Sequence, residues 1–296
     1  MKKVLLASLK AWIHHRGASK GAALAFYTLF ATTPILLLAI AGAGYFFGAE
    51  AAQGGIIAHL QGTVGPNGAQ AVQALLAAAR NPASGRVATI IASVLLLIGA
   101  TSVFVELKDS LDEMWGVPSY RHSALLSLLR TRFLAFALVL VLAFLLFVSL
   151  VCGAAFAMFA RSVGGIWSSS ALVVFSSLIS LIVTASLFAV IYKMLPEAPL
   201  SWRDVWFGAV VTAGLFDLGK YAIGLYLGKS GVASSFGAAG SLIALLLWVY
   251  YSAQIFFLGA EFTRQYALFY GSFKSEKGRG RTLWPVKKIN KEVVGG

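Results

Sequence analysis

Five long stretches without a charged side chain constrain this chain more than any other feature. No Asp, Glu, Lys or Arg occurs at residues 21–49, 87–105, 133–160, 162–192 or 230–260. In a helix, about 20 apolar residues cross the hydrocarbon core of a bilayer. We therefore predict an all-α integral membrane protein that crosses the bilayer several times. Composition agrees, because 12% of the residues are charged, against about 25% in soluble domains.

The predicted domain organisation is one transmembrane domain over residues 1–270 and a basic tail over 271–296. Six spans are expected within the domain. Asp217 and Lys220 interrupt the fifth, which is kept because the neighbouring apolar stretches would otherwise be joined by a loop too apolar for water. The predicted spans lie near residues 23–48, 87–105, 133–160, 168–192, 205–227 and 239–262.

The distribution of Lys and Arg predicts the orientation of these spans. Segments 1–22, 106–132, 193–204 and 263–296 carry 5, 4, 2 and 8 of them, 19 in all, whereas segments 49–86, 161–167 and 228–238 together carry 4. Cytoplasmic loops carry the excess of cations, so both termini are expected in the cytoplasm. The net charge of +13 then fits anionic lipid headgroups at the cytoplasmic face, rather than a nucleic acid, as the partner.

The N-terminus is predicted to form an amphipathic helix on the membrane surface. Leu5, Leu9, Trp12 and Ile13 share one helical face. A signal peptide is not expected, because Lys10 interrupts the apolar run too early.

Two connecting segments are also expected to be helical in part. After the first span, Asn67 is predicted to cap a short helix over 68–80. The second span is predicted to continue as a helix to Trp115, before Pro118 breaks it. The charges expected to be exposed on this continuation are Lys108, Asp109, Asp112 and Glu113.

The fifth span contains the first candidate site. Ionisable groups inside a membrane helix are costly, and they mark function or tight pairing. Asp217 and Lys220 are three residues apart and can pair along the helix, with Tyr221 beside them. Two interpretations stay open: a structural pair, or part of a polar path between the fifth and sixth spans. The glycines expected to let another backbone approach this side are Gly214, Gly224 and Gly228.

The sixth span contains the second candidate site. Tyr250, Gln254 and Glu261 lie on one side of the helix. From its depth, Asp217 is expected to reach a tyrosine hydroxyl of this span. Glu261 is expected to pair with one of three cations at the inner boundary. Those cations are Arg264, Arg203 and Lys108. The predicted substrate-binding residues are Asp217, Lys220, Tyr221, Tyr250, Gln254 and Glu261.

Motifs for enzymatic or metal chemistry are missing from the sequence. The four histidines are scattered, and no H-E-x-x-H, P-loop or G-x-G-x-x-G occurs. Residues 17–21 fit G-x-S-x-G, but no strand precedes them, as that nucleophile motif requires. Asp109, Asp112 and Glu113 can bind a metal, but on an exposed helix they are more simply solvated charges. We predict no enzymatic activity, no catalytic residue, no metal and no cofactor.

Six short motifs point to one known family. They are KGAALAFYTLF (20–30) with Pro34, Leu111 with MWGV (114–117), DVWFGA (204–209), FGAAGSL (236–242), LWVYYSAQ (247–254) and GAE (259–261). Together they resemble the YihY/BrkB family of bacterial inner-membrane proteins, over about residues 10–270. One departure is Phe236, where the family commonly has Tyr. The resemblance implies a multi-pass protein of the bacterial inner membrane with six helices, in a family that has carried virulence and ribonuclease labels.

Three functional hypotheses follow. The first is a transporter or lipid-handling protein that moves an amphiphilic or anionic lipid-like substrate, with Lys220 on a phosphate and Gln254 and Tyr250 along the path. The second is a non-transporting scaffold or partner subunit in envelope biogenesis, with envelope proteins as partners. The third is a membrane-associated ribonuclease, but six spans leave no soluble catalytic domain for it. Oligomeric state is not predicted.

Overall fold

The computed structural model describes residues 1–80, 102–117, 169–229 and 239–273. Every regular element in these ranges is a helix, as predicted, and none of them contains a strand. The predicted span 133–160, most of the span 87–105, Phe236 and the tail from residue 274 lie outside the described residues. One helix covers residues 102–115. The others are α1 (Lys2–His14), α2 (Gly17–Phe47), α3 (Ala49–Arg80), α6 (Ser169–Met194), α7 (Trp202–Lys229) and α9 (Gly240–Phe269).

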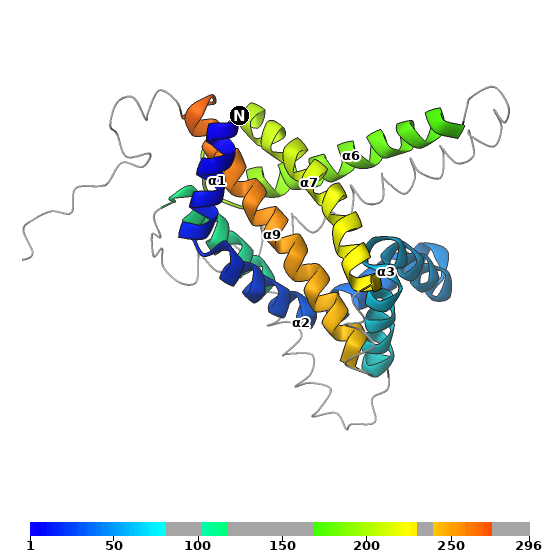
Figure 1. Cartoon of the computed structure of the whole chain (residues 1–296). Coiled ribbons are helices and arrows are strands. Elements are labelled where there is room, and N and C mark those ends of the chain that lie inside the picture. Colours follow the sequence, from blue (N-terminus) through cyan, green and yellow to red (C-terminus); the bar gives the residue numbers. More distant parts are fainter. Residues whose placement is uncertain (81–101, 118–168, 230–238, 274–296) are drawn as a thin grey trace, which may run out of the picture.

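Helix α9 is the centre of the described bundle. It packs against α1, α2, α3 and α7, while α6 packs against α7, and α3 against α2. Figure 1 shows α9 running between the N-terminal helices α1 and α2 and helix α7. Side chains on different sides of α9 therefore meet different elements.

Small residues let α7 and α9 approach closely. Gly208 faces Thr263, and Gly259 faces Thr212, so that a Cβ atom at either glycine would lie 2.7 Å from a carbon of the facing threonine. Each threonine hydroxyl donates a hydrogen bond to the glycine carbonyl four residues earlier on its own helix, at 2.8 Å. This satisfies the hydroxyl locally and leaves the helix surfaces flat enough for close contact, as in membrane helix pairs with small residues.

Two of the glycines that the sequence singled out on the Asp217 side of α7 do not make the contact with α9. Among the described residues, no atom of a neighbouring element lies within 4 Å of a Cβ position at Gly214 or Gly224. At about 100° per residue, both lie on the side of α7 turned away from Gly208 and Thr212. Gly219, which the prediction omitted, does face α9. Gly228 lies within α7, but its surroundings fall outside the described part of the structure.

A buried aromatic cluster joins α6, α9 and the helix over 102–115. The side chain of Tyr192 is completely buried, and its hydroxyl donates to the carbonyl of Phe256 at 2.7 Å. The rings of Trp115, Phe188 and Phe256 contact the Tyr192 ring. Full burial of one large apolar side chain stabilises by about 1.5–3 kcal/mol. This cluster therefore fixes the helices that carry the polar sites described below.

The segment that follows α2 is helical over most of its length. Gly48 ends α2 with a φ of 84°, and Gly65, with a φ of 80°, divides α3 into two parts. Pro66 follows at the start of the second part, where proline is favoured. The predicted helix over 68–80 is confirmed, but Gly65 rather than Asn67 precedes it. The buried cluster that this helix joins contains Ile40, Ala71, Val72, Leu76 and Leu245.

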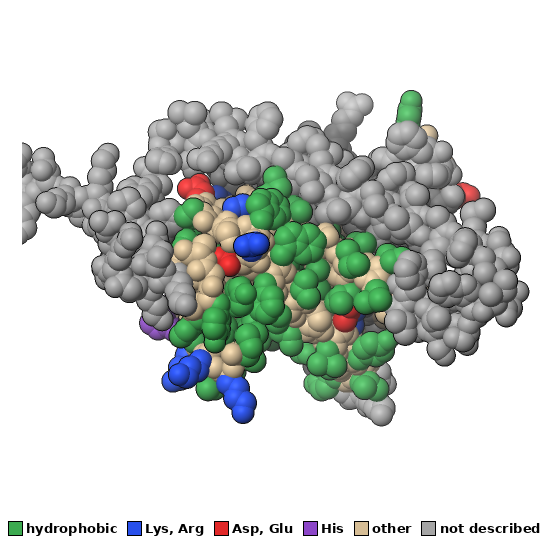
Figure 2. Space-filling view, turned by 90° about the horizontal axis from the view of Figure 1, so that it is seen from above, with side chains coloured by type: hydrophobic (Ala, Val, Ile, Leu, Met, Phe, Trp, Pro, Cys, Tyr) green, Lys and Arg blue, Asp and Glu red, His purple; other side chains and the backbone are tan. Residues whose placement is uncertain are grey.

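Two helices of the described ranges have the length and composition of membrane spans. They are Ser177–Met194 within α6 and Gly240–Phe269, each with a mean hydropathy of 1.8. Both coincide with predicted spans. Figure 2 shows hydrophobic side chains over much of the described surface in one view. An apolar surface of this extent is typical of proteins that contact a membrane or another protein.

Candidate functional site

Asp217 and Lys220 form the intrahelical ion pair that the sequence predicted. Lys220 Nζ lies 2.7 Å from Asp217 Oδ1, and it lies 5.7 Å from the centre of the Phe216 ring. The two side chains are 31% and 33% exposed. At about 100° per residue, both lie away from the side of α7 that carries Gly208. The pair therefore occupies the outer face of α7 rather than the contact between α7 and α9.

Exposed apolar side chains lie beside this ion pair, on the side of Asp217. Leu218, Tyr221 and Leu225 are 69%, 76% and 58% exposed. The ring of Tyr221 consequently points out of the described bundle. A charged pair among such side chains is accessible to a molecule that combines a polar headgroup with an apolar chain.

Gln254 faces the start of α2. Its Nε2 atom lies 3.4 Å from the carbonyl oxygen of Ala18, and its amide fills the space beside Gly21. Its Oε1 atom is buried without a hydrogen-bond partner among the described residues. Tyr250, one turn earlier on α9, is half-buried.

The predicted set of site residues is therefore divided between two places. Asp217, Lys220 and Tyr221 lie on the outer face of α7, whereas Gln254 and Glu261 face the N-terminal helices. In the described ranges, Asp217 pairs with Lys220 and not with a tyrosine hydroxyl of α9. The sequence placed Asp217 and the tyrosines of the sixth span at similar depths but could not give the direction in which each helix face points.

Glu261 is completely buried and pairs with His15. Glu261 Oε1 lies 2.5 Å from His15 Nδ1, while Oε2 has no hydrogen-bond partner within the described part of the chain. Of the three cations predicted to pair with Glu261, Arg264 does interact with its charge, but in the described part of the chain the carboxylate is hydrogen-bonded to His15. The physical reason is that α1 packs along α9 and brings the following turn, with His15, onto the carboxylate.

The turn between α1 and α2 has a backbone suited to presenting His15. Arg16 has a φ of 54°, which is uncommon for a residue other than glycine. Trp12 packs over Gly17, where any added Cβ would overlap the indole ring. The indole Nε1 of Trp12 has no partner among the described residues. Close packing here fixes the angle between the two N-terminal helices.

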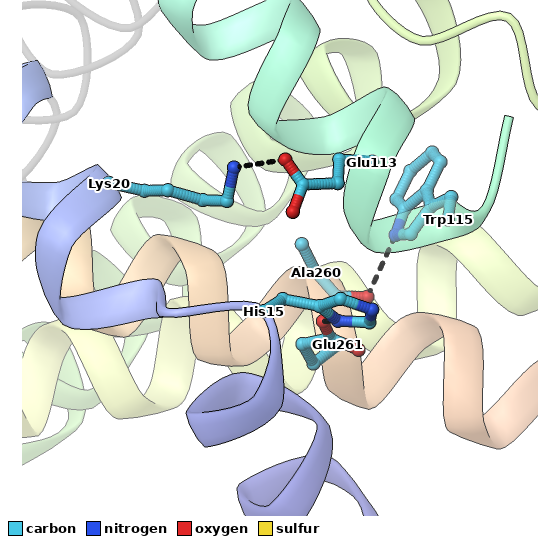
Figure 3. A network of polar contacts seen from close by, with 6 residues as sticks. All are labelled: His15, Lys20, Glu113, Trp115, Ala260 and Glu261. Carbon is cyan, nitrogen blue, oxygen red and sulfur yellow. Dashed lines mark hydrogen bonds and ion pairs between the residues drawn. The ribbon is translucent and has the colours of Figure 1, made fainter. Parts of the chain in front are cut away.

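The helix over 102–115 closes the other side of this pair, as Figure 3 shows. It reaches Trp115, as predicted, and ends at Gly116, whose φ is 72°. The N–H groups of Gly116 and Val117 donate to the carbonyls of Glu113 and Asp112, which is a Schellman motif. The chain therefore turns away just where it meets α9.

Further polar contacts join these elements around Glu261. Lys20 Nζ lies 2.7 Å from Glu113 Oε2, and Trp115 Nε1 donates to the carbonyl of Ala260 at 3.1 Å (Figure 3). The guanidinium of Arg264 lies beside Gly116, and its buried Nε has no partner among the described residues. We call this group the Glu261 cluster; its members are His15, Lys20, Glu113, Trp115, Glu261 and Arg264.

A second network lies on the same helix over 102–115. Lys108 Nζ lies 2.5 Å from Asp112 Oδ2 and 3.4 Å from Glu197 Oε1. Burial lowers the pKa of Lys108, but the hydrogen bond and charge of Asp112, aided by Glu197, raise it by more, so this pKa lies above its usual value. Burial raises the pKa of neighbouring Asp109. Lys108 and Asp112 were predicted to be exposed; their side chains are only 14% and 15% exposed, because they bind Glu197 of the segment after α6.

Sequence reasoning brought together Glu261 and Arg264 of the Glu261 cluster and missed His15. His15 was dismissed as a scattered histidine, although it follows directly on an amphipathic helix. The available signal was that Lys20, Trp115 and Glu261 all lie in motifs that carry the family resemblance. Within the described ranges, no group of three or more His, Cys, Asp or Glu side chains is placed to hold a metal ion.

Comparisons with known proteins identify the chain's relatives. A protein named UPF0761 membrane protein from Pseudomonas aeruginosa is 27% identical over 260 residues, which are 84% of this chain and 59% of that protein. One from Stenotrophomonas maltophilia is 28% identical over 258 residues, 84% of this chain and 57% of the relative. A third, from Verminephrobacter eiseniae, is 29% identical over 169 residues, 57% of this chain and 39% of the relative.

The chain spans less than two thirds of the length of the curated relatives it matches. No solved structure matches it. The family described as virulence factor BrkB matches residues 8–280, which is most of the chain. Together with the relatives' names, this match shows that the protein is a membrane protein and belongs to the BrkB virulence factor family.

Proposed function

We propose that this protein is a transporter or lipid-handling protein for an amphiphilic, anionic, lipid-like substrate. The observation that carries the proposal is the Asp217–Lys220 pair, which is about a third exposed on the apolar outer face of α7. Ionisable groups inside a membrane are costly and are retained mainly where they function. An exposed pair contributes only about 0–1 kcal/mol to stability, so stability alone gives a weak reason for its presence.

The arrangement suits a headgroup next to an apolar chain. Lys220 offers an ammonium group to a phosphate or another anion, and Asp217 neutralises that ammonium when no headgroup is bound. Leu218, Tyr221 and Leu225 are exposed beside the pair and would contact the acyl chain. In this proposal, Tyr250, Gln254 and Glu261 belong to a second part of the site, on α9, which positions that helix against α1 and α2.

The proposed setting is the bacterial inner membrane, with six spans and both termini in the cytoplasm. The excess of Lys and Arg in the two terminal segments and in segments 106–132 and 193–204 supports this orientation. Helices α2, α6, α7 and α9 supply the first, fourth, fifth and sixth of the proposed spans. The proposed transmembrane domain covers residues 1–270, although Ser272 still donates two hydrogen bonds to Asp204 at the start of α7.

The test is to reconstitute the purified protein with phosphatidylethanolamine and phosphatidylglycerol. Native mass spectrometry then measures which of these lipids the protein retains. Lys220→Gln removes the proposed headgroup contact. A charged hydrogen bond contributes about 1.5–3 kcal/mol, so retention of phosphatidylglycerol should fall roughly tenfold or more. Arg203→Gln, which removes an exposed cation from the first turn of the same helix, is the matched control and should retain the lipid.

The reversed pair, Asp217→Lys with Lys220→Asp, separates binding from structure. It keeps an intrahelical ion pair but moves the ammonium group by about one helical turn. Selective retention should then fall while the protein stays folded. Unchanged retention of phosphatidylglycerol in Lys220→Gln and in the reversed pair would overturn the proposal and favour a scaffold role.

A further inference from the structure

Helix α1 divides into three sectors around its axis. At about 100° per residue, Val4 and Ser8 point in one direction, and Leu5 and Leu9 in the next. The third direction, on the far side from these, carries only polar side chains and one alanine. Its members are Lys3, Ala7, Lys10 and His14.

The first sector binds the bundle. Val4 and Ser8 are buried, with exposures of 0% and 1%, and Ser8 donates to the carbonyl of Val4. Trp12 packs against the main buried cluster. Trp12 was predicted to share the membrane-facing side with Leu5, Leu9 and Ile13; the structure turns it toward the bundle instead. The apolar residues of α1 therefore serve two different contacts.

The second sector is apolar and uncovered. Leu5, Leu6, Leu9 and Ile13 are 50%, 60%, 42% and 68% exposed. An apolar stripe of this kind on one side of a short helix is costly in water. It is the pattern of helices that lie in the plane of a membrane interface.

Charge decides what covers this stripe. The third sector is cationic, and no Asp or Glu occurs anywhere in residues 1–49. A second copy of α1 would bring like charges together, whereas an anionic bilayer surface attracts each Lys or Arg. Figure 2 shows Lys and Arg side chains beside hydrophobic ones at one edge of the described surface.

The position of α1 along α9 also favours an anionic bilayer surface as the partner that covers the apolar stripe. The turn after α1 reaches Glu261, near the end of the apolar helix Gly240–Phe269 and one turn before Arg264. A helix docked at the end of a membrane span lies at the depth of the headgroups, where charges are least costly.

From these observations we infer that α1 is an interfacial anchor that binds the anionic surface of the bilayer. Leu5, Leu9 and Ile13 enter the boundary between headgroups and acyl chains, and Lys3 and Lys10 lie among the lipid phosphates. Lys2, within the apolar sector, reaches the headgroups by extending its flexible chain. This inference does not depend on the function proposed for Asp217 and Lys220.

The test measures the depth of two neighbouring residues in the full-length protein. Cys152→Ala removes the one natural cysteine, and Leu9→Cys or Lys10→Cys then carries an environment-sensitive fluorophore. The proteins are reconstituted in vesicles of brominated phosphatidylcholine, with or without phosphatidylglycerol. In anionic vesicles, we expect a blue shift and strong quenching at position 9, and weak quenching at position 10.

A second variant tests the electrostatic part. Lys3→Gln with Lys10→Gln should lower quenching at position 9 in anionic vesicles to the level in neutral vesicles. The midpoint of thermal unfolding, measured alongside, shows that these variants remain folded. Equally weak quenching at both positions in anionic vesicles would overturn the inference. Quenching at position 9 that is independent of phosphatidylglycerol would also overturn it. Efficient cross-linking of Leu9→Cys between two copies would overturn it as well and would assign the stripe to self-association.

Discussion

Two side-chain pairs of this protein each contain a carboxylate and have opposite surroundings. Asp217 and Lys220 are three residues apart on one helix, and about a third of each side chain is exposed. His15 and Glu261 are 246 residues apart, and Glu261 has no exposed surface. Exposed pairs contribute about 0–1 kcal/mol, whereas breaking a buried pair costs about 3–5 kcal/mol. Surroundings therefore assign the buried pair to structure and leave the exposed pair free for function.

The largest effect should come from breaking the buried pair. His15→Ala leaves the Glu261 carboxylate without its partner, so the free energy of unfolding should fall by about 3–5 kcal/mol. The measurement is equilibrium unfolding of the purified protein in mixed detergent micelles. Hydrogen exchange should show that α1 loses protection first, because His15 joins α1 to α9.

A double variant controls for loss of packing at this position. His15→Leu with Glu261→Leu removes both polar partners and keeps apolar volume, so most of the lost stability should return. If His15→Ala changed stability by less than 1 kcal/mol, on the order expected of an exposed pair, the contrast between the two pairs would disappear.

An intermediate effect should distinguish the two sides of α7. Gly208→Ala places a methyl group against Thr263, and overpacking of this kind costs about 1–3 kcal/mol. Gly214→Ala adds the same methyl group on the open side, where alanine is the better helix former by up to about 1 kcal/mol. Thermal unfolding should thus show a lower midpoint for the first variant and an equal or higher one for the second.

A compensating exchange tests the cause of the Gly208 effect. Thr263→Gly makes room for the new methyl group. Gly208→Ala should therefore lower stability less in a protein that carries Thr263→Gly than it does in the wild type. Equal destabilisation by Gly208→Ala and Gly214→Ala would contradict the assignment of the two sides.

The hydrophobic periodicity and the charge pattern of the sequence predicted those features that depend on residues close together in the chain. The helical fold, the spans of α6 and α9, and the pairing of Asp217 with Lys220 all follow from residues near one another in the chain. The partner of Glu261 did not, because it depends on how α1 packs against a helix more than 200 residues later. The glycines of α7 that face α9, Gly208 and Gly219, were not identified for the same reason, because only the neighbouring helix decides which side of α7 is packed.

The smallest effect on stability should come from the exposed pair. Lys220→Ala removes an ammonium group that is 33% exposed and leaves Asp217 31% exposed. The free energy of unfolding should change by no more than about 1 kcal/mol, in the same micelles in which His15→Ala loses several times as much. Asp217→Ala should behave alike, because it leaves Lys220 equally accessible. A loss of several kcal/mol in either variant would show that the pair is buried by something in the folded protein. Asp217 and Lys220 would then belong with His15 and Glu261 as a structural contact, and the lipid-handling proposal would lose the observation that carries it.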